Sequence, residues 1–282
     1  MKFKTRDGTH LFYEDTGTGK PLVLIHGWPL SSAMWEYQLN ELPERGIRCI
    51  AYDRRGFGKS DHPAVGFDYD TLASDLNDLL EHLDLHDVTL AGFSMGGGEV
   101  VRYLSTYGSD RVTRIALIAA VTPFMLKTSD NPDGVDKSVF DDIEAGLRVD
   151  RPNFLTDFTK TFFGFGWISS PISDAMLASN VELAMHASSR ATLGCAKAFS
   201  QTDFRNDLKA ISVPALIIHG DADKTVPFEA SGQRTAKAIA GSKLVVYSGA
   251  PHGLHYTERA RLNADLESWV AAGVSGVRSA AE

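Results

Sequence analysis

Short apolar runs alternate along the chain with segments whose apolar positions have helical spacing. The runs are almost continuously hydrophobic, which is typical of strands buried on both faces of a parallel sheet. Six runs have this character: LVLIH (22–26), IRCIAY (47–52), VTLAGF (88–93), VTRIALIA (112–119), PALIIHG (214–220) and KLVVY (243–247). Near the N-terminus, KFKT and LFYED predict an additional hairpin that turns at Asp7-Gly8.

Helical patterns separate these strands. One begins near Ser31-Ser32, a second follows Asp70, a third follows Ser94, and two more cover about 229–240 and 257–271. Strands that alternate with helices predict a doubly wound sheet, so the expected fold class is α/β.

The segment 123–208 breaks this alternation, because it has no convincing strand and contains helical patterns rich in phenylalanine. An all-helical insertion in an α/β fold is typical of a lid over a binding site. The alternative is that these helices extend the core. We expect an α/β core at 1–122 and 209–282 and a helical cap at 123–208.

Composition narrows the possible partners. The chain has 282 residues, 43% of them hydrophobic, and a net charge of −8. Its charges are scattered, with no basic stripe, so nucleic acid is not an expected partner. Cys49 and Cys195 lie in such different settings that we expect free thiols. With no apolar run of membrane-span length and no signal-peptide core at the N-terminus, the expectation is a cytoplasmic enzyme without membrane contact.

One motif points to covalent catalysis. Gly92-Phe93-Ser94-Met95-Gly96 fits G-x-S-x-G and stands between a predicted strand and a predicted helix. A nucleophile at such a turn has a strained backbone, and glycines two residues to either side avoid collisions with neighbouring elements. Ser94 is therefore the predicted nucleophile, and the alternative is a glycine-rich turn with a passive serine.

A serine nucleophile needs a base, and in this fold the triad order is serine, acid, histidine. His252 lies in GAPHGLHY, in a loop between the last strand and a helix, where the base is expected. His255 is the competing residue, although its position carries it toward the helix. His26 and His219 end buried strands and are predicted to be structural.

The acid is expected in the loop after PALIIHG, where Asp221 and Asp223 both occur. We favour Asp223, because it lies further along the turn toward the carboxyl edge of the sheet. Asp221 is the alternative and would otherwise serve as a turn-forming aspartate.

An oxyanion hole requires two backbone N–H donors. One is expected from Met95, the residue after the nucleophile, and the other from the loop His26-Gly27-Trp28-Pro29. Trp28 is the predicted donor there, because Pro29 has no N–H. Phosphate-loop, dinucleotide-loop and zinc motifs are all incomplete, so neither a metal nor an organic cofactor is implied.

The strings HGWPL, DRRGFGKSD, GFSMGGGEV, AVTP, HGDADKTVPFE and GAPHG together resemble the α/β-hydrolase family of cofactor-free haloperoxidases, perhydrolases and small aryl esterases. The resemblance implies an eight-stranded, mostly parallel sheet with helices on both faces and a helical cap between strands 6 and 7. It also implies the triad and oxyanion residues given above, and frequent homo-oligomers. The expected substrate pocket contains Pro29, Phe93, Val121, Phe124, Phe158, Phe162, Phe199, Val226 and Phe228.

These features predict acyl transfer from small aryl or short-chain carboxylic esters to water or to hydrogen peroxide. The alternatives are a lactonase or γ-lactamase on the same triad, or a small-ligand binding protein that keeps the fold. Pro29 leads to a further hypothesis. Because its fixed φ restricts Trp28, we infer that the Trp28 carbonyl faces the acyl pocket and accepts a hydrogen bond from peroxide.

Overall fold

Eight strands form a single sheet with the order β1-β2-β4-β3-β5-β6-β7-β8 in the computed structural model, which describes residues 1–166 and 170–272. β3 to β8 are parallel to one another, whereas β2 runs antiparallel to both β1 and β4. The strands are β1 (Lys2–Lys4), β2 (His10–Thr16), β3 (Lys20–Ile25), β4 (Ile47–Tyr52), β5 (Val88–Phe93), β6 (Val112–Ile118), β7 (Ala215–Gly220) and β8 (Lys243–Tyr247). The predicted mostly parallel sheet and the N-terminal hairpin are confirmed.

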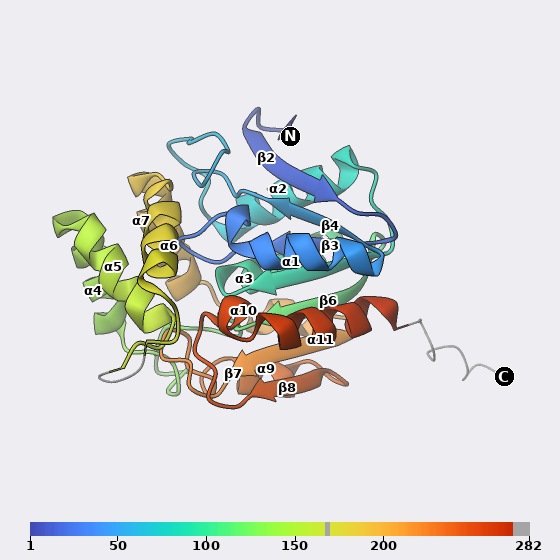
Figure 1. The fold of residues 1–282 in the computed structure, drawn as a ribbon. Coiled ribbons are helices and arrows are strands. Elements are labelled where there is room, and N and C mark those ends of the chain that lie inside the picture. Colours follow the sequence, from blue (N-terminus) through green and yellow to red (C-terminus); the bar gives the residue numbers. More distant parts are fainter. Residues whose placement is uncertain (167–169, 273–282) are drawn as a thin grey trace.

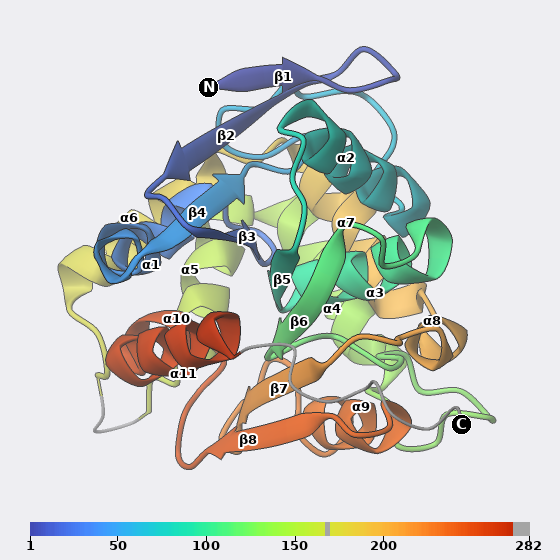
Figure 2. The same cartoon turned by 90° about the vertical axis from the view of Figure 1, so that its right-hand side faces the viewer.

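Helices cover both faces of the sheet (Figure 2). Helices α1 and α11 lie on one face, and α2, α3 and α9 lie on the other. The core helices and turns are η1 (Ser32–Trp35), α1 (Glu36–Glu41), η2 (Pro43–Arg45), α2 (Tyr69–His82), α3 (Met95–Tyr107), α9 (Gly232–Ala238), α10 (Leu254–Thr257) and α11 (Arg259–Ala271). The helix predicted near Ser31-Ser32 is divided in the structure into three short segments, η1, α1 and η2. Pro43 accounts for the last division, because it cannot donate to the carbonyl one turn earlier.

Five helices follow one another between β6 and β7. The first four gather beside the carboxyl edge of the sheet (Figure 1), whereas the last one packs against α3 and α9 (Figure 2). They are α4 (Lys137–Val149), α5 (Arg151–Phe162), α6 (Asp174–Met185), α7 (Ser189–Gln201) and α8 (Arg205–Lys209). The side chains of Asp136, Asp150, Ser173 and Ser188 cap the first four by accepting backbone N–H bonds. The division into core and cap stays a prediction, and residues 167–169 and 273–282 within it lie outside the described residues.

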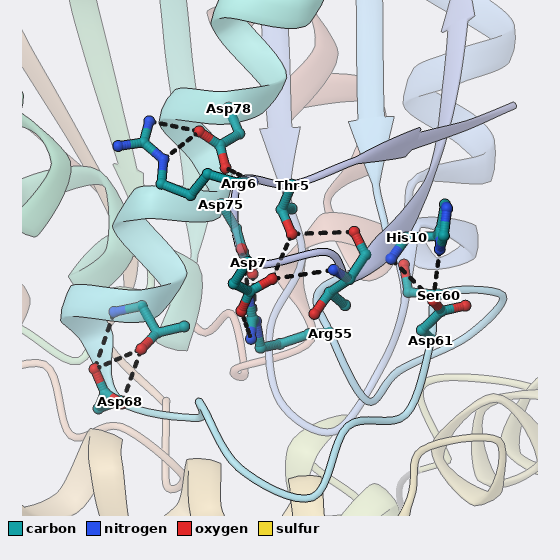
Figure 3. A network of polar contacts seen from close by, with 12 residues as sticks. Thr5, Arg6, Asp7, His10, Arg55, Ser60, Asp61, Asp68, Asp75 and Asp78 are labelled. Atoms are coloured by element: carbon teal, nitrogen blue, oxygen red, sulfur yellow. Dashed lines mark hydrogen bonds and ion pairs between the residues drawn. The ribbon is translucent and has the colours of Figure 1, made fainter.

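Ion pairs attach the N-terminal hairpin to the rest of the molecule (Figure 3). The Arg6 side chain donates from Nε to Asp78 Oδ1 on α2 at 2.7 Å. Arg55, in the loop after β4, donates to both carboxylate oxygens of Asp75 and to Asp7 in the hairpin turn. The Arg55 and Asp75 side chains are almost fully buried. Arg55 therefore joins the loop after β4 to α2 through Asp75, and to the hairpin through Asp7.

Cys49 in β4 and Cys195 in α7 are both buried free thiols, as predicted. Of the helices in the described part of the chain, none combines the length and hydrophobicity needed to cross a lipid bilayer.

Candidate active site

Ser94 occupies the sharp turn between β5 and α3. Its backbone has φ 54° and ψ −117°, an uncommon region for a residue with a side chain. The Ser94 N–H donates to the Ile118 carbonyl at the end of β6 at 2.8 Å, which holds the turn in place. A Cβ on Gly92 would lie 2.4 Å from the Gly96 carbonyl oxygen. The turn therefore requires glycine at this position, as the motif indicates.

Two further residues from separate strand ends meet Ser94. His252 follows β8 and places its Nε2 atom 2.9 Å from Ser94 Oγ. Asp223 follows β7, and its Oδ2 atom lies 2.6 Å from His252 Nδ1. All three side chains are buried, so the structure brings the predicted triad together as one continuous hydrogen-bonded chain.

The Asp223 carboxylate is surrounded by donors. Its Oδ1 atom accepts backbone N–H bonds from Thr225 and Val226, each at 2.8 Å. Burial by itself opposes ionisation, but the charge of His252 and the hydrogen bonds from His219 and His252 outweigh it and lower the pKa of Asp223. The carboxylate is thus ionised at neutral pH, as a group that stabilises a protonated histidine must be.

His219 has a more specific position than the sequence indicates. Its Nε2 atom lies 2.9 Å from the Val226 carbonyl and 3.3 Å from Asp223 Oδ2. The Asp223 oxygen that contacts His252 is therefore also in contact with a second histidine, His219. Sequence reasoning assigned His219 only to the end of a buried strand, because strand position does not show which loop folds back over it.

The alternative acid, Asp221, has another partner. Its Oδ1 atom accepts the Gly249 backbone N–H at 2.6 Å, which joins the loops after β7 and β8. Asp221 is exposed, in contrast to Asp223. This geometry supports Asp223 as the acid and the turn-forming role for Asp221.

The alternative base, His255, lies in α10 and is packed among aromatic rings. Its ring centroid is 5.1 Å from that of Phe93 and 6.2 Å from that of Trp35. Burial, with a smaller contribution from His252, lowers the pKa of His255 to about 3, so the ring is neutral. His255 Nδ1 has no hydrogen-bond partner within the described residues.

The two residues predicted as oxyanion donors adjoin Ser94, since Met95 follows it in the chain and Trp28 lines the same cavity. Met95 is the first residue of α3, so its N–H has no acceptor inside the helix. A Cβ on Gly27 would lie 2.6 Å from Phe93 Cδ1 and 3.1 Å from Ser94 Cβ, so a larger residue would push the Phe93 ring out of place. The next residue, Trp28, uses its indole N–H to bond the Thr192 carbonyl at 3.0 Å, and its bond to Pro29 is cis.

A buried polar network lies behind this loop. Arg54 donates from Nη2 to the His26 carbonyl at 2.8 Å and from Nε to Glu99 Oε2 at 2.9 Å. His26 Nε2 accepts the Arg54 backbone N–H at 3.0 Å, so the ring is neutral and donates from Nδ1 to Gly27. Burial and the Arg54 charge lower the pKa of His26. Arg54 thereby connects the oxyanion loop to Glu99 on the helix after Ser94, a role the sequence did not reveal.

A cavity of about 40 Å³ opens beside Ser94, lined mainly by apolar side chains of the core and the cap. Of the predicted pocket residues, it includes Val121, Phe158, Phe199 and Val226, together with Trp28. Sequence reasoning missed six others: Met125, Val135, Val139, Phe140, Ile143 and Thr225. Three of these six residues could have been found from the sequence, because positions 139, 140 and 143 are apolar and have the spacing of one helix face.

Two predicted pocket residues line a separate small cavity instead. Pro29 and Phe162 border a space of about 10 Å³ on the other side of Phe158. The Phe162 ring is also in edge contact with His252, with 4.8 Å between the centroids. Phe162 therefore contacts the base rather than the cavity at Ser94.

The other three predicted pocket residues do not line the cavity at Ser94. The buried Phe93 ring packs behind His252, with 5.0 Å between the centroids. Phe124 lies beneath the Arg205 guanidinium, and Phe228 packs against His219. Their position in the sequence next to site residues did not determine which way their side chains point.

Within residues 1–166 and 170–272, no group of three or more His, Cys, Asp or Glu side chains is arranged to hold a metal ion.

The sequence of this chain is similar to those of known proteins. Residues 20–259 match the family model for the alpha/beta hydrolase fold. A non-heme chloroperoxidase of Kitasatospora aureofaciens is 41% identical over 93% of this chain and 96% of its own length. A bifunctional esterase/perhydrolase of Acinetobacter calcoaceticus is 40% identical over 94% of this chain and 98% of its own length.

This chain is also similar in sequence and in fold to a protein of known structure. The crystal structure of a bromoperoxidase from Bacillus anthracis is 48% identical and has a TM-score of 0.93. The match covers 96% of this chain and the whole of that one. The chain belongs to the α/β-hydrolase family.

Proposed function

We propose that this protein is a serine hydrolase that transfers acyl groups from small carboxylic esters to water or to hydrogen peroxide. The observation that carries the proposal is the hydrogen-bonded chain from Ser94 Oγ through His252 to Asp223. Three residues from three loops at one sheet edge have the geometry of an activated nucleophile, its base and the group that orients the base.

The geometry supports a two-step reaction. His252 Nε2 takes the Ser94 proton as Oγ attacks the ester carbonyl, and the Met95 and Trp28 N–H groups stabilise the oxyanion. The imidazolium, stabilised by Asp223, returns the proton to the leaving alcohol. An acceptor, deprotonated by His252, then attacks the acyl-enzyme, and the same donors stabilise the second oxyanion. When this intermediate collapses, the bond between the acyl carbon and Ser94 Oγ breaks, and His252 returns the proton to Oγ.

The names of the relatives support hydrogen peroxide as a second acceptor, because they include chloroperoxidases and an esterase/perhydrolase. Attack by water on the acyl-enzyme gives a carboxylic acid, and attack by peroxide gives a peracid. The peracid oxidises halide in solution, so haloperoxidase activity requires no redox group in the protein. The resemblance also supports a homo-oligomer.

Turnover of p-nitrophenyl acetate together with labelling by a fluorophosphonate tests the proposal. A serine hydrolase does both, whereas a ligand-binding protein with the same fold does neither. Adding lactone and lactam substrates to the same assay tests the lactonase and γ-lactamase alternatives.

The chain-length dependence of hydrolysis should show a small acyl site. We expect kcat/KM to fall steeply from p-nitrophenyl acetate to longer esters, because the cavity at Ser94 has a volume of only about 40 Å³. When steric room runs out, one methylene changes transition-state binding by about 1–3 kcal/mol. Equal kcat/KM values for acetate and dodecanoate esters would contradict this.

Replacing Pro29 with leucine tests the peroxide hypothesis. Leucine adds an N–H and frees φ next to the Trp28 carbonyl, which we infer to be the acceptor for peroxide. Since a net hydrogen bond is worth about 0.5–1.5 kcal/mol, the ratio of perhydrolysis to hydrolysis should fall severalfold. The measurement follows peracid and acid formation from one acetate ester in parallel. An unchanged ratio would show that Pro29 only stiffens the loop.

A further inference from the structure

A groove of about 490 Å³ runs along the outside of the cap between α4 and α7, which lie side by side (Figure 1). Its apolar part is formed by Leu126, Phe140, Ile143, Leu193 and Ala196. The α4 rim is charged, but its charges are already paired with each other, Lys137 with Asp141 and Arg148 with Glu144. The groove therefore offers an apolar surface beneath an α4 wall whose charges are paired, with the exposed Lys197 on the α7 side.

The groove and the cavity at Ser94 share a wall. Phe140 and Ile143, one turn apart on α4, line both spaces. Both side chains are half-buried, and the Phe140 ring packs against Phe199 with 6.5 Å between the centroids. A single layer of side chains thus separates the space next to the nucleophile from a space about ten times larger.

A second surface cleft also borders the cavity, at Val135, but its lining is chemically different. Its charged residues Asp133, Glu229, Arg234 and Lys237 form no salt bridge within the described residues, whereas four of the five charged residues along the α4–α7 groove are paired with each other. An apolar chain would gain little there and would desolvate charged groups. The α4–α7 groove is the compartment that suits an aliphatic chain.

We propose that Phe140 determines the acyl-chain limit of this enzyme, by closing the cavity at Ser94 off from the groove between α4 and α7. The groove is then an outer compartment for the distal methylenes of a medium-chain acyl group, and it becomes accessible when the Phe140 ring is removed. This inference rests on the proposed esterase function.

The test is the kcat/KM series for p-nitrophenyl acetate, butyrate, hexanoate and octanoate in the wild type and in Phe140→Ala. We expect the octanoate-to-acetate ratio of kcat/KM to rise at least about tenfold in the variant, because each methylene gains room that it lacked. Acetate turnover is the reference for this ratio, because Phe140 lines the cavity at Ser94 and its removal acts on kcat/KM for every ester.

Phe158→Ala is the matched control. Phe158 also lines the cavity at Ser94, but it does not line the groove, and its far side borders the small space at Pro29. The same ring deletion should therefore leave the octanoate-to-acetate ratio much lower than in Phe140→Ala. An equal rise in both variants would overturn the proposal, since general enlargement of the cavity would explain it.

A second variant tests the path of the chain. Adding Leu193→Trp to Phe140→Ala fills the groove from α7 and should remove most of the gain on octanoate while acetate turnover persists. Retained octanoate activity in the double variant would place the chain elsewhere and reject the groove.

The proposal and the proposed function fail in distinguishable ways. Absence of acetate turnover and of Ser94 labelling in the wild type would reject the esterase function itself. Acetate turnover and Ser94 labelling in the wild type, with no rise of the octanoate-to-acetate ratio in Phe140→Ala, would reject only the partition. The rates at which ethyl and octyl fluorophosphonates label Ser94 compare a short and a long chain in each variant without turnover. Circular dichroism checks that each variant is folded.

Discussion

Replacing Ser94 with alanine is expected to abolish ester turnover while leaving the fold intact. Alanine keeps the Cβ that serine already has at φ 54° and removes only the hydroxyl that His252 contacts. In a serine protease, loss of the nucleophile lowers kcat by about 10⁶, and we expect a loss of that order. Hydrolysis of p-nitrophenyl acetate measures it, and the melting temperature reports on the fold.

Ser200→Ala is a suitable control, because Ser200 is also buried but lies in α7 and bonds a backbone carbonyl of its own helix. This variant should keep both its turnover and its fluorophosphonate labelling. Turnover near the wild-type level in a purified Ser94→Ala protein would exclude the serine mechanism.

Asp223→Asn should lower kcat by about 10⁴, the cost of the same exchange in a serine protease triad. The carboxylate accepts from His252 Nδ1, so the proton lies on that nitrogen and Nε2 is free to act as the base. An asparagine amide that donates to Nδ1 favours the opposite tautomer, with the proton on Nε2. The base is then blocked although the geometry is nearly unchanged.

Asp221→Asn makes the identical chemical change two residues away. The asparagine oxygen can still accept the Gly249 N–H, so kcat should stay within a small factor of the wild type. Steady-state kinetics of both variants on one acetate ester decide between the two carboxylates. A large loss in Asp221→Asn with little effect in Asp223→Asn would show that the acid is assigned to the wrong residue.

The sheet and the candidate catalytic residues could be proposed from the sequence because their signals are local. A strand buried on both faces must be continuously apolar, and this applies to Leu22–Ile25 and Val88–Phe93. A nucleophile in a tight turn needs small residues around it, so Ser94 appears within a five-residue motif. In a parallel sheet the carboxyl ends meet at one edge, which brings Asp223 and His252 to Ser94 without any knowledge of side-chain packing.

The pocket, the contacts behind the triad and the outer groove were decided only by the tertiary structure. Which aromatic side chains face Ser94 depends on how the helices between β6 and β7 pack beside the sheet, so Phe140 lines the cavity while Phe124 lies under Arg205. Arg54 and His219 have their partners at Glu99 and Asp223 because loops fold over strand ends. Such side-chain directions are set by long-range packing, which leaves no periodic signal along the chain.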